Sequence, residues 1–204
     1  MRLIDSHSHL FLEEFSEDLP QVIERARAVG VTHIFMPNID STTAGTMLSV
    51  CNTYKGYCFP MIGLHPTSVN ADYEKELEFV AYELESSKEY VAIGEIGMDL
   101  YWDKTFLKEQ QAVLDRQINW ALEYELPVVI HCRDAFDYIY KVLEPYKKSP
   151  LKGIFHSFTG GVEEASKILE FSDFFIGING VVTFKKSHLP EVLLEIPLER
   201  IVLE

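Results

Sequence analysis

Short apolar runs recur along the whole chain, and longer segments with helical signals separate them. Runs such as VVIH and GIFH are apolar at nearly every position, which is typical of parallel strands that are covered on both faces. Strands that alternate with helices in this way predict an α/β fold with a parallel sheet. The spacing alone does not separate a closed barrel from an open, doubly wound sheet. The eight predicted strands are Leu3–Ile4, Thr32–Pro37, Phe59–Leu64, Val91–Ile96, Pro127–His131, Gly153–His156, Phe174–Ile178 and Ile201–Leu203.

Three of the segments between these runs carry clear helical patterns. Residues 18–29 begin with an acidic residue, have a proline in the first turn and are followed by Gly30, which is the usual order of helix start and stop signals. Residues 106–124 carry apolar side chains at helical spacing, and residues 163–171 do so over a shorter length. No linker or shift of composition divides the 204 residues. We therefore predict a single domain, residues 1–204.

Composition limits the cellular setting and the partners. The three cysteines lack metal-knuckle spacing, and the N-terminus lacks the basic and apolar segments of a signal peptide. No run is long and apolar enough to cross a bilayer, so the chain is predicted to be cytoplasmic, without a membrane or an obligate protein partner. The net charge of −14 argues against general binding of nucleic acid. The negative net charge does not exclude a small phosphate-containing substrate that is held by metal ions.

The residues that end the predicted strands are the most informative feature for function. Five of the seven histidines, together with one glutamate, lie at the carboxyl ends of apolar runs. Active sites of α/β barrels are built at that end of the strands. A single histidine at such a place is usually structural, but a set of this size predicts a site. The residues are His7, His9, His65, Glu95, His131 and His156.

Imidazoles combined with a carboxylate favour zinc, manganese or iron over calcium. His7 and His9 alternate along one strand, so they share a face and can hold one ion. His131 and His156 come from separate strands and can hold a second ion, with Glu95 between the two. Two ions about 3.5–4 Å apart activate a water molecule and stabilise the charge of a hydrolytic transition state. The alternative for Glu95 is a buried charge that is satisfied by a partner in the core.

The motifs DSHSHL, GLHP, GEIGMD, HCRDA, HSFTGG and GVVTFK occur in this order. Together they resemble the TatD family of metal-dependent deoxyribonucleases, within the amidohydrolase-like barrels. The resemblance implies a TIM-type (β/α)8 barrel and two divalent metal ions (Zn²⁺, Mn²⁺ or Mg²⁺). It also implies hydrolysis of phosphodiester bonds, exonucleolytic and acting on single-stranded DNA or DNA ends. Carried over by position, it makes His7, His9, Glu95, His131 and His156 the metal ligands.

Other candidate residues surround this predicted centre. By the resemblance, His65 lies near the substrate phosphate, and Glu95 and His65 are the candidate catalytic residues. Arg133 can pair with phosphate or form a salt bridge with a neighbouring helix. Tyr101 and Trp102 can stack on an exposed base or close the mouth of the barrel. Ser157 begins a loop whose backbone amides can face an anion.

The eighth apolar run ends at Glu204. The resemblance implies that a Thr-Asp pair follows, with the aspartate as a metal ligand and general base. Glu204 has the same strand parity but lies roughly 6.6 Å deeper, at about 3.3 Å per residue, so we do not expect it to replace that aspartate. The resemblance thus predicts a barrel truncated after the eighth strand, without its last helix and with weakened hydrolysis.

Two other functions remain open from the sequence. One is an amidohydrolase-type enzyme on the same barrel that cleaves a small amide, lactone or phosphoester. Many such relatives carry a modified lysine on the fourth strand, whereas this chain has Glu95, which favours the nuclease. The other is a truncated, non-catalytic barrel that binds metal without turnover.

Overall fold

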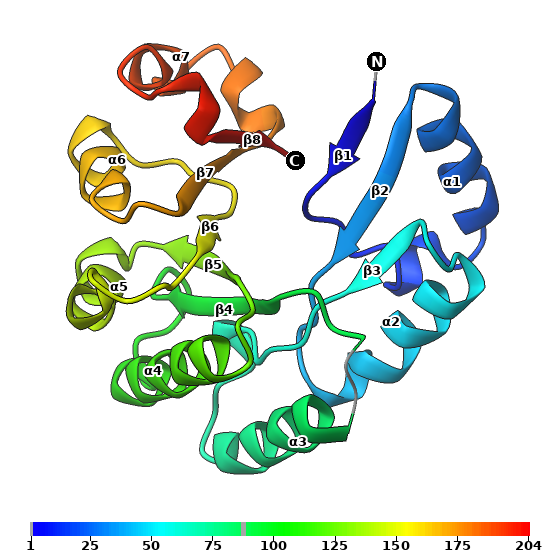
Figure 1. Ribbon diagram of the computed structural model, residues 1–204, viewed down its shortest axis with the longest axis horizontal. Coiled ribbons are helices and arrows are strands. Elements are labelled where there is room, and N and C mark those ends of the chain that lie inside the picture. The colour runs from blue at the N-terminus through cyan, green and yellow to red at the C-terminus, as the bar shows by residue number, and fades with distance from the viewer. Residues whose placement is uncertain (1, 87–88) are drawn as a thin grey trace.

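The computed structural model describes residues 2–86 and 89–204. In these residues eight strands alternate with seven α-helices, and the helices lie on the outside (Figure 1). The strands are β1 (Leu3–Asp5), β2 (Val31–Met36), β3 (Cys58–Pro60), β4 (Ile93–Asp99), β5 (Val128–Arg133), β6 (Gly153–Phe155), β7 (Phe174–Ile178) and β8 (Ile201–Leu203). The α-helices are α1 (Leu19–Ala28), α2 (Ser41–Thr53), α3 (Tyr73–Ser86), α4 (Leu107–Glu123), α5 (Phe136–Leu143), α6 (Val162–Leu169) and α7 (Leu189–Leu193). The short 3₁₀ helices are η1 (Glu13–Phe15), η2 (Pro66–Ser68), η3 (Glu144–Tyr146), η4 (Gly180–Thr183) and η5 (Leu198–Arg200).

All strand pairs are parallel, and neighbours in the chain are neighbours in space. One sheet has the order β1-β2-β3 and the other β4-β5-β6-β7-β8. An isolated bridge between Ile62 and Ile93 joins the two sheets. At the other edge, the Ser6 hydroxyl donates to the Leu203 carbonyl at 3.1 Å. The predicted α/β fold is confirmed, and the strand order is that of a TIM-type barrel.

Strand β4 is longer than predicted. We expected this strand to end at Ile96, but it continues to Asp99 and pairs there with Arg133 of β5. The residues beyond Glu95 alternate between faces, because Ile96 and Met98 are fully buried in the main hydrophobic cluster. Asp99 therefore shares the inward face with Glu95. The strand predicted for residues 59–64 is shorter than expected, since β3 ends at Pro60.

Two buried glutamines on helix α4 bond the backbone of Leu64, in the loop after β3, and of Asp99, at the end of β4. The Gln117 side chain accepts from the Leu64 backbone N–H at 2.7 Å and donates to the Leu64 carbonyl at 3.3 Å. Gln110, two turns earlier, makes the same pair of bonds with the backbone of Asp99, at 3.0 and 3.2 Å. The bonds of Gln117 also help to position His65, because His65 comes directly after Leu64.

We expect Gln117→Met to destabilise the fold by roughly 2–5 kcal/mol, since it keeps the volume but leaves two buried backbone groups without partners. Chemical denaturation followed by circular dichroism measures this change. The control is Gln111→Met on the same helix, because Gln111 is half-buried and its side chain makes no hydrogen bond among the described residues. The control is expected to change stability by about 0.5 kcal/mol or less. Equal effects of the two substitutions would contradict the role of Gln117.

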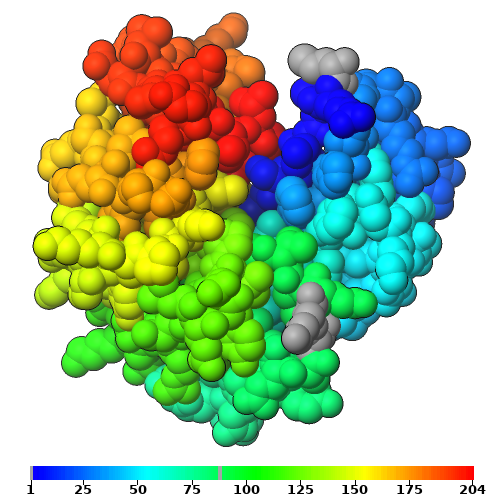
Figure 2. All heavy atoms as spheres, in the orientation of Figure 1, coloured from blue at the N-terminus to red at the C-terminus, as the bar shows by residue number. Residues whose placement is uncertain are grey.

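A large apolar cavity of about 840 Å³ lies within the ring of strands, lined by residues of β1, β2, β3, β5, β6 and β8. Its lining includes Ile4, Phe35, Phe59 and Leu203. The space-filling view shows a separate feature, a surface hollow between the blue N-terminal and the red C-terminal segments (Figure 2).

Among the described residues, no helix is both long and apolar enough to cross a membrane.

Candidate metal centre

The predicted site residues come together around the carboxylate of Glu95. This side chain projects from the middle of β4 and is only 2% exposed. The histidines reach it from the ends of other strands, since they follow β1, end the loop after β3, lie within β5 or follow β6 directly. The five histidines with a ring nitrogen within 3.5 Å of Glu95 are His7, His9, His65, His131 and His156.

The two oxygens of Glu95 face two different groups of histidines. Oε2 lies 3.1 Å from His7 Nε2 and 3.3 Å from His9 Nε2. Oε1 lies 2.9 Å from His131 Nδ1, 3.4 Å from His65 Nε2 and 3.5 Å from His156 Nε2. Glu95 thus stands between the histidine pair of the first strand and the histidines of later strands.

The electrostatics of the cluster follow from burial and from this one carboxylate. Burial works to raise the pKa of Glu95, but the surrounding histidines outweigh it and hold the pKa well below its usual range. Burial lowers the pKa of His7, against the opposing effect of Glu95. Burial also acts to lower the pKa of His131, but the carboxylates of Glu95 and Asp99 raise it overall. An ionised carboxylate is therefore the central charge of the site.

The donor atoms fit divalent cations. Within the part of the chain that the structure describes, three sets of ligand atoms lie within 4.8 Å of one another: His7, His9 and Glu95; His65, Glu95 and His131; and His7, His156 and Glu204. The Nε2 atoms of His7 and His9 are 3.2 Å apart, and the rings of His7 and His156 stack at 3.5 Å. Imidazoles packed this closely, with a carboxylate between them, are a ligand set for zinc or manganese. The metal-ligand roles stay predictions, and so does the number of ions.

Asp99 is a site residue that the sequence reasoning missed. Its Oδ2 lies 2.9 Å from Nε2 of His131, and its side chain is 4% exposed. The signal was present in the sequence, because Asp99 follows Glu95 by an even number of residues in one strand. It was overlooked because the strand was expected to end before it.

Glu204 lies closer to the site than we expected. Its Oε2 is 3.2 Å from His156 Nδ1 and accepts the Ser157 backbone N–H at 2.7 Å. Glu204 lies deeper along the strand than the aspartate implied by the resemblance, but its long side chain still reaches His156. Gly177 on the adjacent strand leaves room for it, because a Cβ there would lie 2.3 Å from Glu204 Oε1.

The residues predicted to bind substrate lie around this cluster. His65 points Nε2 to Glu95, while its Nδ1 bonds the Thr67 hydroxyl at 2.6 Å. The guanidinium of Arg133 lies over the ring of Tyr101, 3.8 Å from its centroid, and 5.5 Å from that of Trp102. Tyr101 and Trp102 are 51% and 75% exposed, so their rings are accessible for stacking, and their role stays a prediction.

Ser157 was predicted to begin a loop whose backbone amides face an anion, but its own backbone N–H is not free to do so. Its backbone N–H is already bonded to Glu204, and its hydroxyl accepts from the Asn179 side chain. Ser157 therefore contributes to the site through Glu204. Its role toward an anionic substrate stays a prediction.

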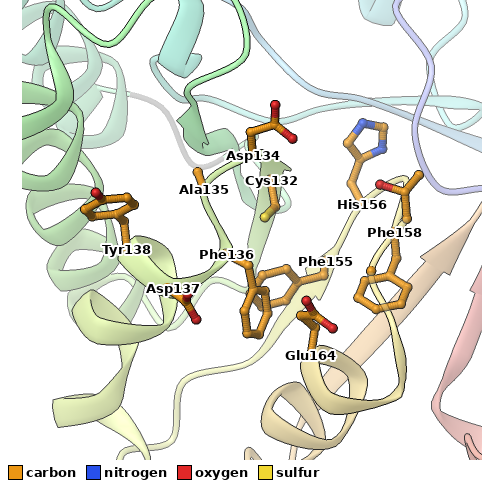
Figure 3. Close-up of a pocket in the computed structure, with 12 residues that line it drawn as sticks. Cys132, Asp134, Ala135, Phe136, Asp137, Tyr138, Phe155, His156, Phe158 and Glu164 are labelled. Atoms are coloured by element: carbon orange, nitrogen blue, oxygen red, sulfur yellow. The ribbon is translucent and has the colours of Figure 1, made fainter.

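A cavity of about 320 Å³ opens beside the cluster, between the loops that follow β5 and β6 (Figure 3). His156 lies at its edge, so the cavity and the metal centre share a side chain. Phe136, Phe155 and Phe158 contribute its aromatic surface, whereas its acidic residues are Asp134, Asp137 and Glu164. The cavity therefore suits a flat, uncharged group better than a second anion.

Sequence and structure comparisons each find known proteins of the same family. The model of the family described as TatD related DNase matches residues 4–204. The uncharacterized metal-dependent hydrolase YabD of Bacillus subtilis is 36% identical over 203 residues, which cover 99% of this chain and 78% of YabD. The 3′-5′ ssDNA/RNA exonuclease TatD of a Pantoea species is 32% identical over 204 residues, covering 99% of this chain and 78% of that protein. The crystal structure of YjjV, a TatD homolog from Escherichia coli, superposes with a TM-score of 0.90 at 30% identity, covering 100% of this chain and 78% of YjjV.

Proposed function

Because the chain belongs to the family of TatD related DNases, we propose that it is a metal-dependent hydrolase that cleaves phosphodiester bonds of single-stranded DNA from an end. The observation that carries this proposal is the Glu95 carboxylate, whose two oxygens face separate groups of histidines. The relatives support it in two ways: YabD is named a metal-dependent hydrolase, and the Pantoea protein is named an exonuclease.

In this proposal His7, His9, Glu95, His131 and His156 hold the divalent ions. When bound, such ions supply Lewis-acid stabilisation of the charge that develops on a phosphoryl group, and they lower the pKa of water. His65 lies on the same side as His131 and can donate a hydrogen bond to a phosphoryl oxygen through Nε2. Its other nitrogen is held by Thr67, which orients the ring toward the site.

Substrate binding would rest on Arg133, Tyr101 and Trp102. The chain is acidic overall, so a long duplex would be repelled and the attraction to phosphate must be local. Arg133 supplies a fixed positive charge at the end of β5, and the two exposed aromatic rings beside it offer surfaces for stacking unpaired bases. The aromatic part of the neighbouring cavity can accept a terminal base. An unpaired end fits these features better than a paired one, because its bases are free to stack.

The direct test is hydrolysis of a fluorescently labelled single-stranded oligonucleotide by metal-stripped protein reloaded with Mn²⁺, Mg²⁺ or Zn²⁺. We expect stepwise shortening from one end that depends on the added ion. Small amide, lactone and phosphotriester substrates are assayed in parallel. Hydrolysis of one of these without cleavage of DNA would favour the amidohydrolase-type alternative. Metal binding without turnover of any substrate would favour a non-catalytic barrel.

Replacing both Tyr101 and Trp102 with alanine is expected to raise the KM for single-stranded DNA roughly 5- to 100-fold, since stacking contributes about 1–3 kcal/mol per base. The kcat is expected to change little, because neither ring contacts the Glu95 cluster. The matched control is Tyr82→Ala, which removes a 65% exposed aromatic side chain on helix α3. An unchanged KM in the double variant would exclude these rings from substrate binding.

A further inference from the structure

His131 and His156 turn opposite ring nitrogens toward Glu95. His131 presents Nδ1 to Oε1 at 2.9 Å, whereas His156 presents Nε2 to the same oxygen at 3.5 Å. The other nitrogen of each ring faces a second carboxylate, that of Asp99 for His131 and that of Glu204 for His156. We propose that Asp99 and Glu204 are positioning residues that fix opposite tautomers of these two rings, so that both lone pairs point into the metal centre. This inference rests on the proposed metal-binding role of the Glu95 cluster.

Asp99 is held rigidly in the position that this role requires. Its Oδ2 lies 2.9 Å from His131 Nε2, and its Oδ1 accepts the Tyr101 backbone N–H at 3.0 Å. The buried Gln110 bonds both the backbone N–H and the carbonyl of Asp99. Both nitrogens of His131 face carboxylates, and these carboxylates raise the pKa of the ring. With a cation held beside Glu95, Nδ1 would present its lone pair to that cation. The remaining ring proton then lies on Nε2, where the Asp99 carboxylate can accept it.

Glu204 lies beside the outer nitrogen of the other ring, as a close contact and not as a hydrogen bond. Its side chain is 4% exposed, and Oε2 lies 3.2 Å from His156 Nδ1 while it accepts the Ser157 N–H at 2.7 Å. Nδ1 of His156 is buried and forms no hydrogen bond of good geometry among the described residues. With a cation bound at Nε2, the ring proton would lie on Nδ1, and the Glu204 carboxylate is the nearby acceptor for it.

The need for two different tautomers follows from where the rings are attached. His131 lies within β5, next to β4, whereas His156 follows the end of β6, one strand further from Glu95. The nearer ring reaches the carboxylate with Nδ1, which is close to its backbone, and the farther ring needs the more distant Nε2. A carboxylate on the outer side of each ring can accept the proton of the nitrogen that faces away from Glu95. Outer carboxylates commonly do this for metal-bound histidines.

The first test measures metal affinity without any reaction. In Asp99→Asn and Glu204→Gln, the side-chain amide can donate to the ring nitrogen, which favours the proton on the nitrogen that faces the centre. We expect the Kd for Zn²⁺, measured by competition with a chromophoric chelator, to rise about 10- to 100-fold in each. Gly177→Ala keeps both acids but pushes the Glu204 carboxylate away, so it is expected to weaken binding in the same direction.

The control variant is Asp103→Asn, an aspartate in the loop after β4 that caps Thr105 and does not contact the cluster. It should leave the Kd for Zn²⁺ unchanged. An unchanged Kd in Asp99→Asn or Glu204→Gln would overturn the proposal for that residue. Melting temperatures of the metal-free variants show whether a loss of affinity reflects unfolding instead, which would also overturn it.

The second test reads the tautomers directly. Proton–nitrogen NMR correlations of the zinc-loaded, ¹⁵N-labelled protein should show the ring proton on Nε2 of His131 and on Nδ1 of His156. The same tautomer on both rings would overturn the proposal. If zinc binds with opposite tautomers and DNA is not hydrolysed, the proposed nuclease function fails and this inference stands. If the unchanged protein does not bind zinc, both fail.

Discussion

Glu95→Gln is expected to remove metal-dependent hydrolysis almost entirely, with kcat/KM falling by at least about 10²- to 10⁴-fold, the usual cost of removing a positioned catalytic group. The substitution keeps the shape of the side chain but removes the charge that stands between five histidines. Metal affinity should fall by more than about 100-fold, because loss of a ligand costs more than loss of an outer partner. Steady-state kinetics and metal titration measure the two effects.

The matched control for this variant is Glu163→Gln, which neutralises an 81% exposed glutamate on helix α6. It should leave both quantities unchanged. If Glu95→Gln binds metal and hydrolyses DNA like the unchanged protein, Glu95 is a satisfied core charge, and the metal centre must be sought elsewhere.

Gly97→Ala should have the largest effect on stability. Gly97 has a φ of 133°, in the region that favours glycine, and a Cβ there would lie 2.0 Å from the carbonyl oxygen of His131. Neither the β4 backbone nor the β5 backbone can move without disturbing the Glu95–His131 contact. We expect the free energy of unfolding to fall by roughly 3–5 kcal/mol, as the sum of backbone strain and overpacking. Urea denaturation measures it.

The same substitution at Gly45 serves as the control. Gly45 lies inside helix α2, and a Cβ there would meet no atom within 4 Å. Gly45→Ala is therefore expected to stabilise the protein by about 0.5–1 kcal/mol. If Gly97→Ala is as stable as the unchanged protein, the two strands do not approach one another as closely as described.

Much of the fold was predictable because buried parallel strands have a simple sequence pattern. Every predicted strand overlaps an observed one, and the helices expected at residues 18–29, 106–124 and 163–171 correspond to α1, α4 and α6. The strand ends were less predictable. The run from Phe59 to Leu64 is continuous in the sequence, but β3 ends at Pro60. Beyond it, Ile62 makes an isolated bridge to Ile93, and the backbone of Leu64 is bonded by the Gln117 side chain of a distant helix.

The site was predictable to the extent that parallel strands bring their carboxyl ends together. This rule alone groups the histidines with Glu95. It does not specify which nitrogen of each ring faces the carboxylate, because that depends on side-chain contacts across strands. The contact of Asp99 with His131 and that of Glu204 with His156 belong to this class. The sequence reasoning did not include Asp99 and did not expect Glu204 to reach the site; only the three-dimensional arrangement shows these contacts.

The most direct test of the metal centre is a crystal structure of the protein soaked in Mn²⁺, with diffraction data collected near the manganese absorption edge. We expect anomalous density beside the Glu95 carboxylate, within about 2.0–2.3 Å of its oxygens and of nitrogens from His7, His9 or His131, as is usual for such ligands. Glu95→Gln crystals soaked in the same way should lack it. Manganese bound only at sites away from Glu95, or equal density in the two crystals, would contradict the assignment of this cluster as the metal centre.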